Sequence, residues 1–201
     1  MRLVLASNNA GKLSEMRAVL AGLDLELVPQ AQLGIADADE TATTFIENAL
    51  LKARHAARLS GQPSLGDDSG ICVDALDGAP GLYSARYAGA HGDAAANNAK
   101  LLDTLREVPE AQRGAHFYCV IVLLRSADDP APLIAQGRWN GRILETARGS
   151  GGFGYDPVFY DPVLEAGAAE LDPAIKNRVS HRGQALARLR EQLQRLLCDR
   201  P

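Results

Sequence analysis

The alternation of short apolar runs with longer amphipathic segments constrains the fold of this chain more than any other feature. Apolar residues 3–6 form a strand-like run that leads through a polar loop into a helical pattern ending near residue 20. A second strand, at 25–28, precedes a helix at 44–59 whose apolar side chains share one face. This order predicts an α/β fold in which helices pack against a sheet.

The second half of the chain adds a pair of strands and a terminal helix. Residues 116–125 and 133–143 are expected to pair as a long hairpin, which puts antiparallel strands into a mixed sheet. Asp93 is expected to cap a helix running to about residue 108, and leucines at helical spacing predict a final helix at 180–198. The sequence has no repeat or linker, so we expect one domain spanning residues 1–201.

Composition narrows the class of protein. The formal net charge of −4 gives no overall positive field to recruit a nucleic-acid polymer. Three cysteines are an odd number for a disulfide framework, which favours free thiols in a reducing cytoplasm. The longest apolar run, 117–124, is far shorter than the roughly 20 residues of a membrane helix. We therefore expect a cytoplasmic protein that binds neither a membrane nor a nucleic-acid polymer.

A glycine-rich loop at residues 149–157 stands out, because four glycines in six residues are followed by Tyr155 and Asp156 and enclose Phe153. Glycine lets a ligand approach the backbone closely, and an aromatic ring in such a loop can stack on a planar ligand. The alternative is a tight turn whose Phe153 and Tyr155 fill the core. The loop by itself favours neither.

The polar segment from Ser7 to Lys12 lies between the first strand and the first helix. Backbone donors and the helix dipole favour anions at this position, so the hydroxyl, amides and lysine suit a triphosphate. The segment lacks the full Walker pattern, which argues against a P-loop. The alternative is ordinary helix capping by Ser7 or Asn9.

Carboxylates gather in three short segments, as Asp39 and Glu40, Glu47, and Asp67 and Asp68. Oxygen ligands from several segments suit Mg²⁺ that is shared with substrate phosphates. Asp67 and Asp68 are expected at a turn between two short strands, where a cation or donors would neutralise them. Glu47 has an alternative role in a capping box with Thr44.

Basic and polar residues 176–184 precede and enter the terminal helix. Cations at a helix N-terminus oppose its dipole, so this placement favours an anionic or carbonyl-rich ligand. A solvated basic face is the alternative.

Six ordered motifs together resemble the inosine/xanthosine triphosphate pyrophosphatases, a family of non-canonical purine nucleoside triphosphatases. They run from the first strand to the last helix: SNNAGK (7–12), TFIENA (44–49), DDSG (67–70), GAPGLYSARY (78–87), GGFGYDP (151–157) and SHRG (180–183). The resemblance implies an elongated α/β fold of two lobes, with a central mixed sheet flanked by helices and an active-site cleft between the lobes. It also implies a homodimer that hydrolyses XTP, ITP and dITP to the monophosphate and pyrophosphate with Mg²⁺, keeping deaminated purines out of DNA and RNA.

The resemblance also implies roles for individual residues. Asp68 matches the catalytic aspartate and metal ligand, and Phe153 is placed to stack on the base. The second metal-binding carboxylate, usually Glu, aligns with Asp39, with the adjacent Glu40 as the alternative. The remaining substrate-binding positions are Ser7, Asn8, Asn9, Ala10, Gly11, Lys12, Ser69, Gly154, Tyr155, Asp156, Lys176, His181 and Arg182.

Donors such as a backbone N–H, His181 or Arg182 would favour a 6-oxo purine over adenine, because the 6-amino group would face another donor. Many relatives have Thr-Gly-Asn in place of Ser7-Asn8-Asn9, which keeps the hydroxyl and adds an amide here.

Two other functions are compatible with parts of this pattern. A nucleotide-binding regulator would keep the glycine-rich loop and the basic cluster but would not need the carboxylates. A kinase or an enzyme that releases the γ-phosphate would transfer or liberate phosphate, and the absent Walker pattern counts against it.

Overall fold

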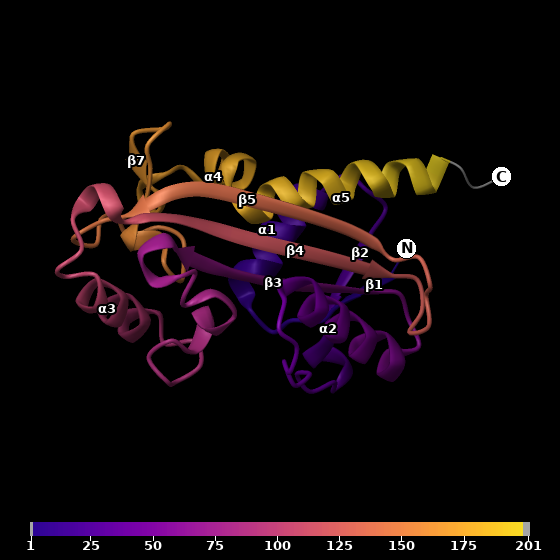
Figure 1. The fold of residues 1–201 in the computed structure, drawn as a ribbon. Helices are drawn as coiled ribbons and strands as arrows, with labels where there is room; N and C mark the ends of the chain where they lie inside the picture. The colour runs from indigo at the N-terminus through magenta and orange to yellow at the C-terminus, as the bar shows by residue number, and fades with distance from the viewer. Residues whose placement is uncertain (1, 199–201) are drawn as a thin grey trace. The chain divides into compact units, whose positions relative to one another are not determined.

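The computed structural model describes residues 2–198 and contains a mixed sheet flanked by helices, as expected (Figure 1). Within these residues the sheet has seven strands in the order β2-β1-β3-β4-β5-β6-β7. The strands are β1 (Arg2–Leu5), β2 (Glu26–Pro29), β3 (Ser64–Val73), β4 (Gly114–Leu124), β5 (Leu133–Ile143), β6 (Phe159–Asp161) and β7 (Ala166–Gly167). β1 pairs in parallel with β2 and β3, whereas β6 pairs antiparallel with β5 and β7.

The helices are α1 (Ala10–Leu20), α2 (Phe45–Ser60), α3 (Ala94–Thr104), α4 (Pro173–Val179) and α5 (His181–Cys198). The chain forms two compact units, each built from separate stretches of sequence. Unit 1 takes its described residues from 1–68, 119–137 and 181–201, and unit 2 consists of 69–118 and 138–180.

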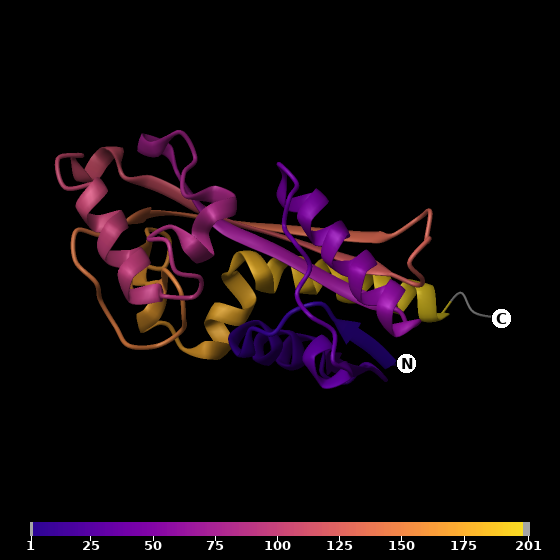
Figure 2. The same cartoon turned by 90° about the horizontal axis from the view of Figure 1, so that it is seen from below.

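Unit 1 has three layers, because alternate side chains of a strand point to opposite faces of the sheet. Leu3 and Leu5 of β1 pack in a core cluster with residues of α1 and α5, and these two helices lie side by side (Figures 1 and 2). Val4 points to the other face, in a cluster with Ala56 of α2. The side chains of Leu196 and Leu197, predicted on the apolar face of the last helix, lie outside the described ones.

Two glycines let helices of unit 1 touch the sheet backbone to backbone. A Cβ on Gly66 of β3 would collide with the carbonyl oxygen of Ala49 and lie 2.8 Å from the backbone nitrogen of Ala53, both in α2. A Cβ on Gly137 of β5 would collide with the carbonyl oxygen of His181, at the start of α5. These close approaches fix the positions of α2 and of the first turn of α5 over the sheet.

Unit 2 has an aromatic core of its own. Phe117 of β4 and Trp139 of β5 both pack against Phe159 of β6, with ring centroids 4.7 and 4.9 Å apart. Leu101 and Leu105, at the end of α3, belong to the same cluster. The other face of these strands carries partly or fully exposed residues, which are Cys72, His116, Tyr118, Arg138 and Asn140.

Three predictions about the elements were wrong in detail. Residues 64–73 form one continuous strand, so Asp67 and Asp68 lie inside β3 and not at a turn. The helix capped by Asp93 ends at Thr104 and not near residue 108. The buried guanidinium of Arg113 donates hydrogen bonds to the carbonyl oxygens of Leu105 and Val108, and Val108 precedes a proline, a position that disfavours helix.

The third difference concerns the basic segment near the C-terminus. The chain forms two helices there, with Ser180 as the C-cap of α4 and α5 beginning at His181. Lys176 and Arg178 therefore lie in the last turn of α4, where the helix dipole stabilises positive charge. The expectation that all of these cations oppose a dipole is wrong.

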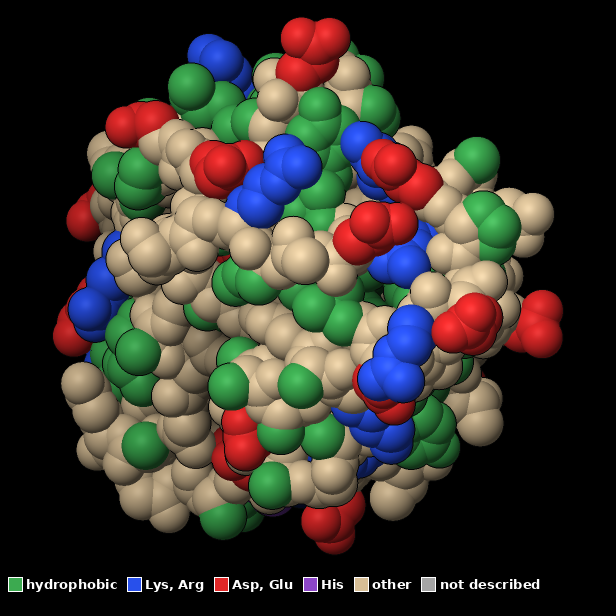
Figure 3. Space-filling view, turned by 90° about the vertical axis from the view of Figure 1, so that its left-hand side faces the viewer, with side chains coloured by type: hydrophobic (Ala, Val, Ile, Leu, Met, Phe, Trp, Pro, Cys, Tyr) green, Lys and Arg blue, Asp and Glu red, His purple; other side chains and the backbone are tan. Residues whose placement is uncertain are grey.

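The surface of the described residues shows mixed charge. On the face seen in Figure 3, acidic and basic side chains are interspersed, which is the pattern of a solvated surface. Among residues 2–198, no helix combines the length and apolar character needed to cross a membrane.

Candidate active site

Two adjacent carboxylates in β3 occupy opposite faces of the sheet in unit 1. Because side chains alternate along a strand, Asp67 shares the face of Leu65, toward α1 and α5. Asp68 shares the face of Gly66, toward α2. Each carboxylate therefore accepts its hydrogen bonds from different residues.

Asp67 is buried in a network of ion pairs, with 1% of its surface exposed. Its Oδ2 accepts a hydrogen bond from Nε of Arg182 at 3.0 Å and one from the Cys119 thiol at 3.1 Å, and Lys12 pairs with its Oδ1. Burial opposes ionisation, but the charges of Arg182 and Lys12 outweigh it and hold the pKa of Asp67 well below its usual range. The ion pairs therefore stabilise the ionised form of Asp67.

Arg182 connects this network to α1. Its Nη1 donates to Oε2 of Glu15 at 2.7 Å, and only 2% of the residue is exposed. Several of its donors are thus directed to Asp67 and Glu15. The structure gives Arg182 a role in holding these carboxylates, and the predicted contact with a purine base stays a prediction.

Asp68 has a different environment. Its Oδ1 accepts a hydrogen bond from Nζ of Lys52 at 2.7 Å, whereas its buried Oδ2 has no hydrogen-bond partner among the described residues. Burial raises the pKa of Asp68, and the Lys52 ammonium offsets part of this effect. A buried carboxylate oxygen without a partner is costly unless something else occupies it. Asp68 therefore fits a metal ligand or a group that binds a catalytic water.

Glu40 is the acidic residue of the 39–40 pair that the structure links to Asp68. Its Oε1 lies 3.1 Å from Nζ of Lys52, the same ammonium that contacts Asp68, and its charge raises the pKa of Asp68. The side chain of Asp39, the predicted second ligand, is exposed. Within residues 2–198 no three His, Cys, Asp or Glu side chains form a ready metal cluster. Asp68 and Glu40 are thus two carboxylates that share the Lys52 ammonium.

The segment from Ser7 to Lys12 forms the start of α1. Asn9 is the N-cap, and its Oδ1 accepts a hydrogen bond from the backbone N–H of Lys12 at 3.0 Å. Ser7 Oγ accepts from the N–H of Asn9 at 3.2 Å, and Ala10 and Gly11 open the helix. The capping alternative is confirmed for Asn9, while Lys12 extends to Asp67.

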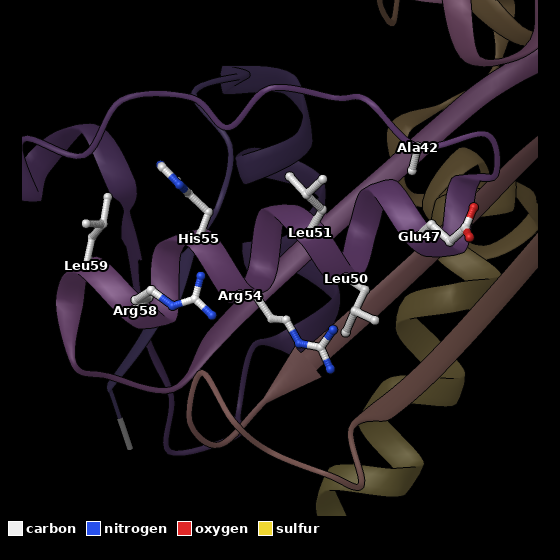
Figure 4. Close-up of a pocket in the computed structure, with 8 residues that line it drawn as sticks. All are labelled: Ala42, Glu47, Leu50, Leu51, Arg54, His55, Arg58 and Leu59. Carbon is white, nitrogen blue, oxygen red and sulfur yellow. The ribbon is translucent and has the colours of Figure 1, made fainter.

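Glu47 lies at the start of α2, where Thr44 is the N-cap that the sequence indicates. Thr44 caps α2, with its Oγ1 accepting from the N–H of Glu47 at 3.2 Å. The Glu47 carboxylate in turn accepts from the Thr44 hydroxyl at 2.8 Å. Glu47 therefore belongs to the helix start (Figure 4).

The glycine-rich loop lies in unit 2 and divides its aromatic residues between two roles. Tyr155 packs in the core and donates its hydroxyl to the carbonyl oxygen of Ser84 at 2.9 Å, so the core-filling alternative is confirmed for this residue. Phe153 is partly exposed, and Nζ of Lys176 lies 4.6 Å from its ring centroid. Oδ2 of the buried Asp156 accepts from the N–H of Phe153 and from Lys176. This network holds the Phe153 ring in place.

The basic segment near the C-terminus thus supplies cations to carboxylates in both units. Lys176 joins Asp156 and Phe153 in unit 2, whereas Arg182 joins Asp67 and Glu15 in unit 1. His181 and Ser180 are buried at the junction of α4 and α5, and Ser69 is half-buried in β3.

Sequence reasoning missed Lys52 and Glu15. Lys52 had a detectable signal, because it lies on the same stripe of α2 as Ala49, Ala53 and Ala56, which the helical pattern assigns to the core. A lysine on a buried stripe requires a charged partner. Glu15 gives no comparable signal, since its partner Arg182 is 167 positions away in the sequence.

The fold and the site define a class of mixed α/β proteins in which one strand carries two adjacent buried carboxylates, one of them fully charge-paired and the other with an oxygen that no described residue binds. The sequence model of the Ham1 family matches residues 3–192, so the chain belongs to the Ham1 family.

Relatives and solved structures agree with this assignment. A dITP/XTP pyrophosphatase of Xanthomonas axonopodis pv. citri is 64% identical over 96% of each chain, and one of Xylella fastidiosa is 60% identical over 94% of this chain and 96% of the relative. The structure of a HAM1 protein from Coxiella burnetii has 48% identity and a TM-score of 0.90, covering 97% of this chain and 99% of that one.

We predict that Asp67→Asn destabilises the fold by about 3 kcal/mol, because it leaves the buried Arg182 without its charge partner. The wild type should lose stability as pH falls below about 4, since the pKa of Asp67 is lower in the folded state than in the unfolded one. The variant should show a smaller loss. Urea unfolding at pH 7 and pH 3 measures both effects.

Asp93→Asn is the matched control, because Asn caps a helix as well as Asp does. If Asp67→Asn costs no more free energy of unfolding than this control, the ion-pair network does not stabilise the fold.

Proposed function

We propose that this protein hydrolyses the non-canonical purine nucleoside triphosphates XTP, ITP and dITP to the monophosphate and pyrophosphate. The observation that carries the proposal is the buried Oδ2 of Asp68, which has no hydrogen-bond partner among residues 2–198, while Oδ1 of Asp68 and the Glu40 carboxylate share Lys52. Membership of the Ham1 family and the names of the relatives support the choice of substrate.

Phosphoanhydride hydrolysis needs charge neutralisation and an oriented water. We propose that the Ser7–Lys12 segment binds the triphosphate, with helix N–H groups and the Lys12 ammonium as donors. Asp68 would orient the attacking water and accept its proton, and Lys52 would hold Asp68 in position. Asp68 and Glu40 would hold Mg²⁺, which neutralises phosphate charge when it is bound.

The base would be recognised by stacking and by donors. We propose that Phe153 stacks on the purine, since Asp156 and Lys176 hold its ring while leaving it partly exposed. His181 and backbone N–H groups would donate to the 6-oxo group, because Arg182 is directed to Asp67 and Glu15. An adenine amino group would then face a donor and be disfavoured.

We also propose that the protein acts as a homodimer, as the resemblance to the pyrophosphatases implies. The partly exposed strand face of unit 2, with His116, Tyr118 and Arg138, is a surface that a second copy would cover. Sedimentation velocity at micromolar concentration distinguishes a dimer from a monomer.

A panel of nucleoside triphosphates with Mg²⁺ tests the reaction directly. We expect XTP, ITP and dITP to release pyrophosphate, with ATP hydrolysed on the order of 10⁴-fold less efficiently, because a mismatched buried donor is costly. Separate assays for pyrophosphate and orthophosphate distinguish the rival functions. Orthophosphate as the first product would identify an enzyme that acts at the γ-phosphate, and binding without turnover would identify a regulator.

Three substitutions test the carboxylates. We predict that Asp68→Asn lowers kcat for ITP at least 100-fold, because the amide cannot accept the water proton. Glu40→Gln should raise the Mg²⁺ concentration needed for half-maximal activity. Asp39→Asn is the matched control, since its side chain is exposed.

Melting temperatures equal to that of the wild type would show that the variants are folded. More than about a tenth of the wild-type kcat in Asp68→Asn, under ~1.4 kcal/mol of barrier, would remove Asp68 from the catalytic role. A larger effect of Asp39→Asn than of Glu40→Gln would restore Asp39 as the ligand.

A further inference from the structure

The segment that carries Glu40 has no regular secondary structure. It follows a 3-10 helix at Gln30–Leu33 and ends where α2 begins, and residues 35–42 belong to neither a helix nor a strand. No backbone ladder fixes such a segment, so side-chain hydrogen bonds must position it. The location of Glu40 beside Lys52 therefore depends on these hydrogen bonds.

Asp37 makes two side-chain hydrogen bonds that hold this segment. Its Oδ1 accepts from Nδ2 of Asn8 at 2.9 Å and from Nε2 of Gln30 at 2.5 Å. Asn8 follows β1 and Gln30 follows β2, and these parallel neighbours end at the same edge of the sheet, where Leu5 pairs with Pro29. One carboxylate oxygen thus joins the acidic segment to the two loops that leave this edge.

Two hydrogen bonds with side chains of α2 also hold the segment at residues 35–42. Nε2 of His55 lies 3.0 Å from the carbonyl oxygen of Ala36, and Oδ1 of the buried Asn48 accepts from the N–H of Ala42 at 3.1 Å. Figure 4 shows His55 on the side of α2 over which the segment passes. The contacts at residues 36, 37 and 42 lie on both sides of Glu40 in the sequence.

We propose that Asp37 is a positioning residue that couples the Ser7–Lys12 segment to the segment carrying Glu40. This inference rests on the proposed function, since Glu40 and Ser7–Lys12 are its metal-binding and triphosphate-binding parts. Asp37 acts through Asn8 as a hydrogen-bond acceptor, so its shape matters more than its charge. The Asn8 amide, which the departure from Thr-Gly-Asn adds at this position, is one of the two donors to Asp37.

The experiment compares Asp37→Ala, which removes the acceptor, with Asp37→Asn, which keeps an acceptor oxygen and removes the charge. We expect amides 36–42 to exchange hydrogen about tenfold faster in Asp37→Ala, because two hydrogen bonds are lost. Amides in the middle of α2 should be unchanged. Asp128→Ala is the matched control, an exposed aspartate in the loop between β4 and β5 of the same unit.

Kinetics with ITP and Mg²⁺ give the second measurement. Asp37→Ala should lower kcat by about tenfold at constant melting temperature, and Asp37→Asn should restore it to within about twofold of the wild type. Unchanged exchange in Asp37→Ala, or an unchanged kcat despite faster exchange, would overturn the proposal. Equal impairment of both variants would also overturn it, because charge would then be the property that matters.

The exchange measurement separates this proposal from the proposed function. If the wild type released no pyrophosphate from any triphosphate, the proposed function would fail while the exchange rates still reported whether Asp37 holds the segment.

Discussion

The ion pairing of Asp67 is the interaction on which the rest of unit 1 depends. A carboxylate buried in the middle of a strand is strongly unfavourable unless cations neutralise it. Lys12 of α1 and Arg182 of α5 supply that positive charge. Arg182 also forms an ion pair with Glu15 of α1 through its Nη1. The network therefore requires α1, β3 and α5 to be assembled together.

The strand geometry then gives Asp68 its distinct chemistry. Because the two aspartates point to opposite faces of β3, Arg182 donates to Asp67 whereas Lys52 donates to Asp68. Asp68 shares the Lys52 ammonium with Glu40, and its other oxygen has no hydrogen-bond partner in the part of the chain that the structure describes. The two adjacent aspartates thus differ: Asp67 is fully paired within the fold, whereas Asp68 has an oxygen that a ligand can occupy.

Close contacts between helix and strand backbones position the cations that pair with Asp67 and Asp68. α2 rests on Gly66, one residue before Asp67 and two before Asp68, and the first turn of α5 rests on Gly137. A side chain at either position would push its helix away from the sheet, and with it Lys52 or Arg182. Packing at two glycines thus determines whether the charged groups reach hydrogen-bonding distance.

The sequence by itself determined the alternating α/β plan, the cap at Asp93 and the motifs of the family, and it offered caps at Thr44 and at either Ser7 or Asn9, because these depend on residues close together in the chain. Only the tertiary structure decided that Asp67 and Asp68 lie within one strand, that Glu40 and Asp68 share the Lys52 ammonium, and that Lys176 and Arg182 pair with different carboxylates. Each of these outcomes depends on pairing between charges brought together from distant segments. Local propensity carries no information about such partners. Because burying an unpaired charge costs much free energy, these partners determine how the charged residues are arranged.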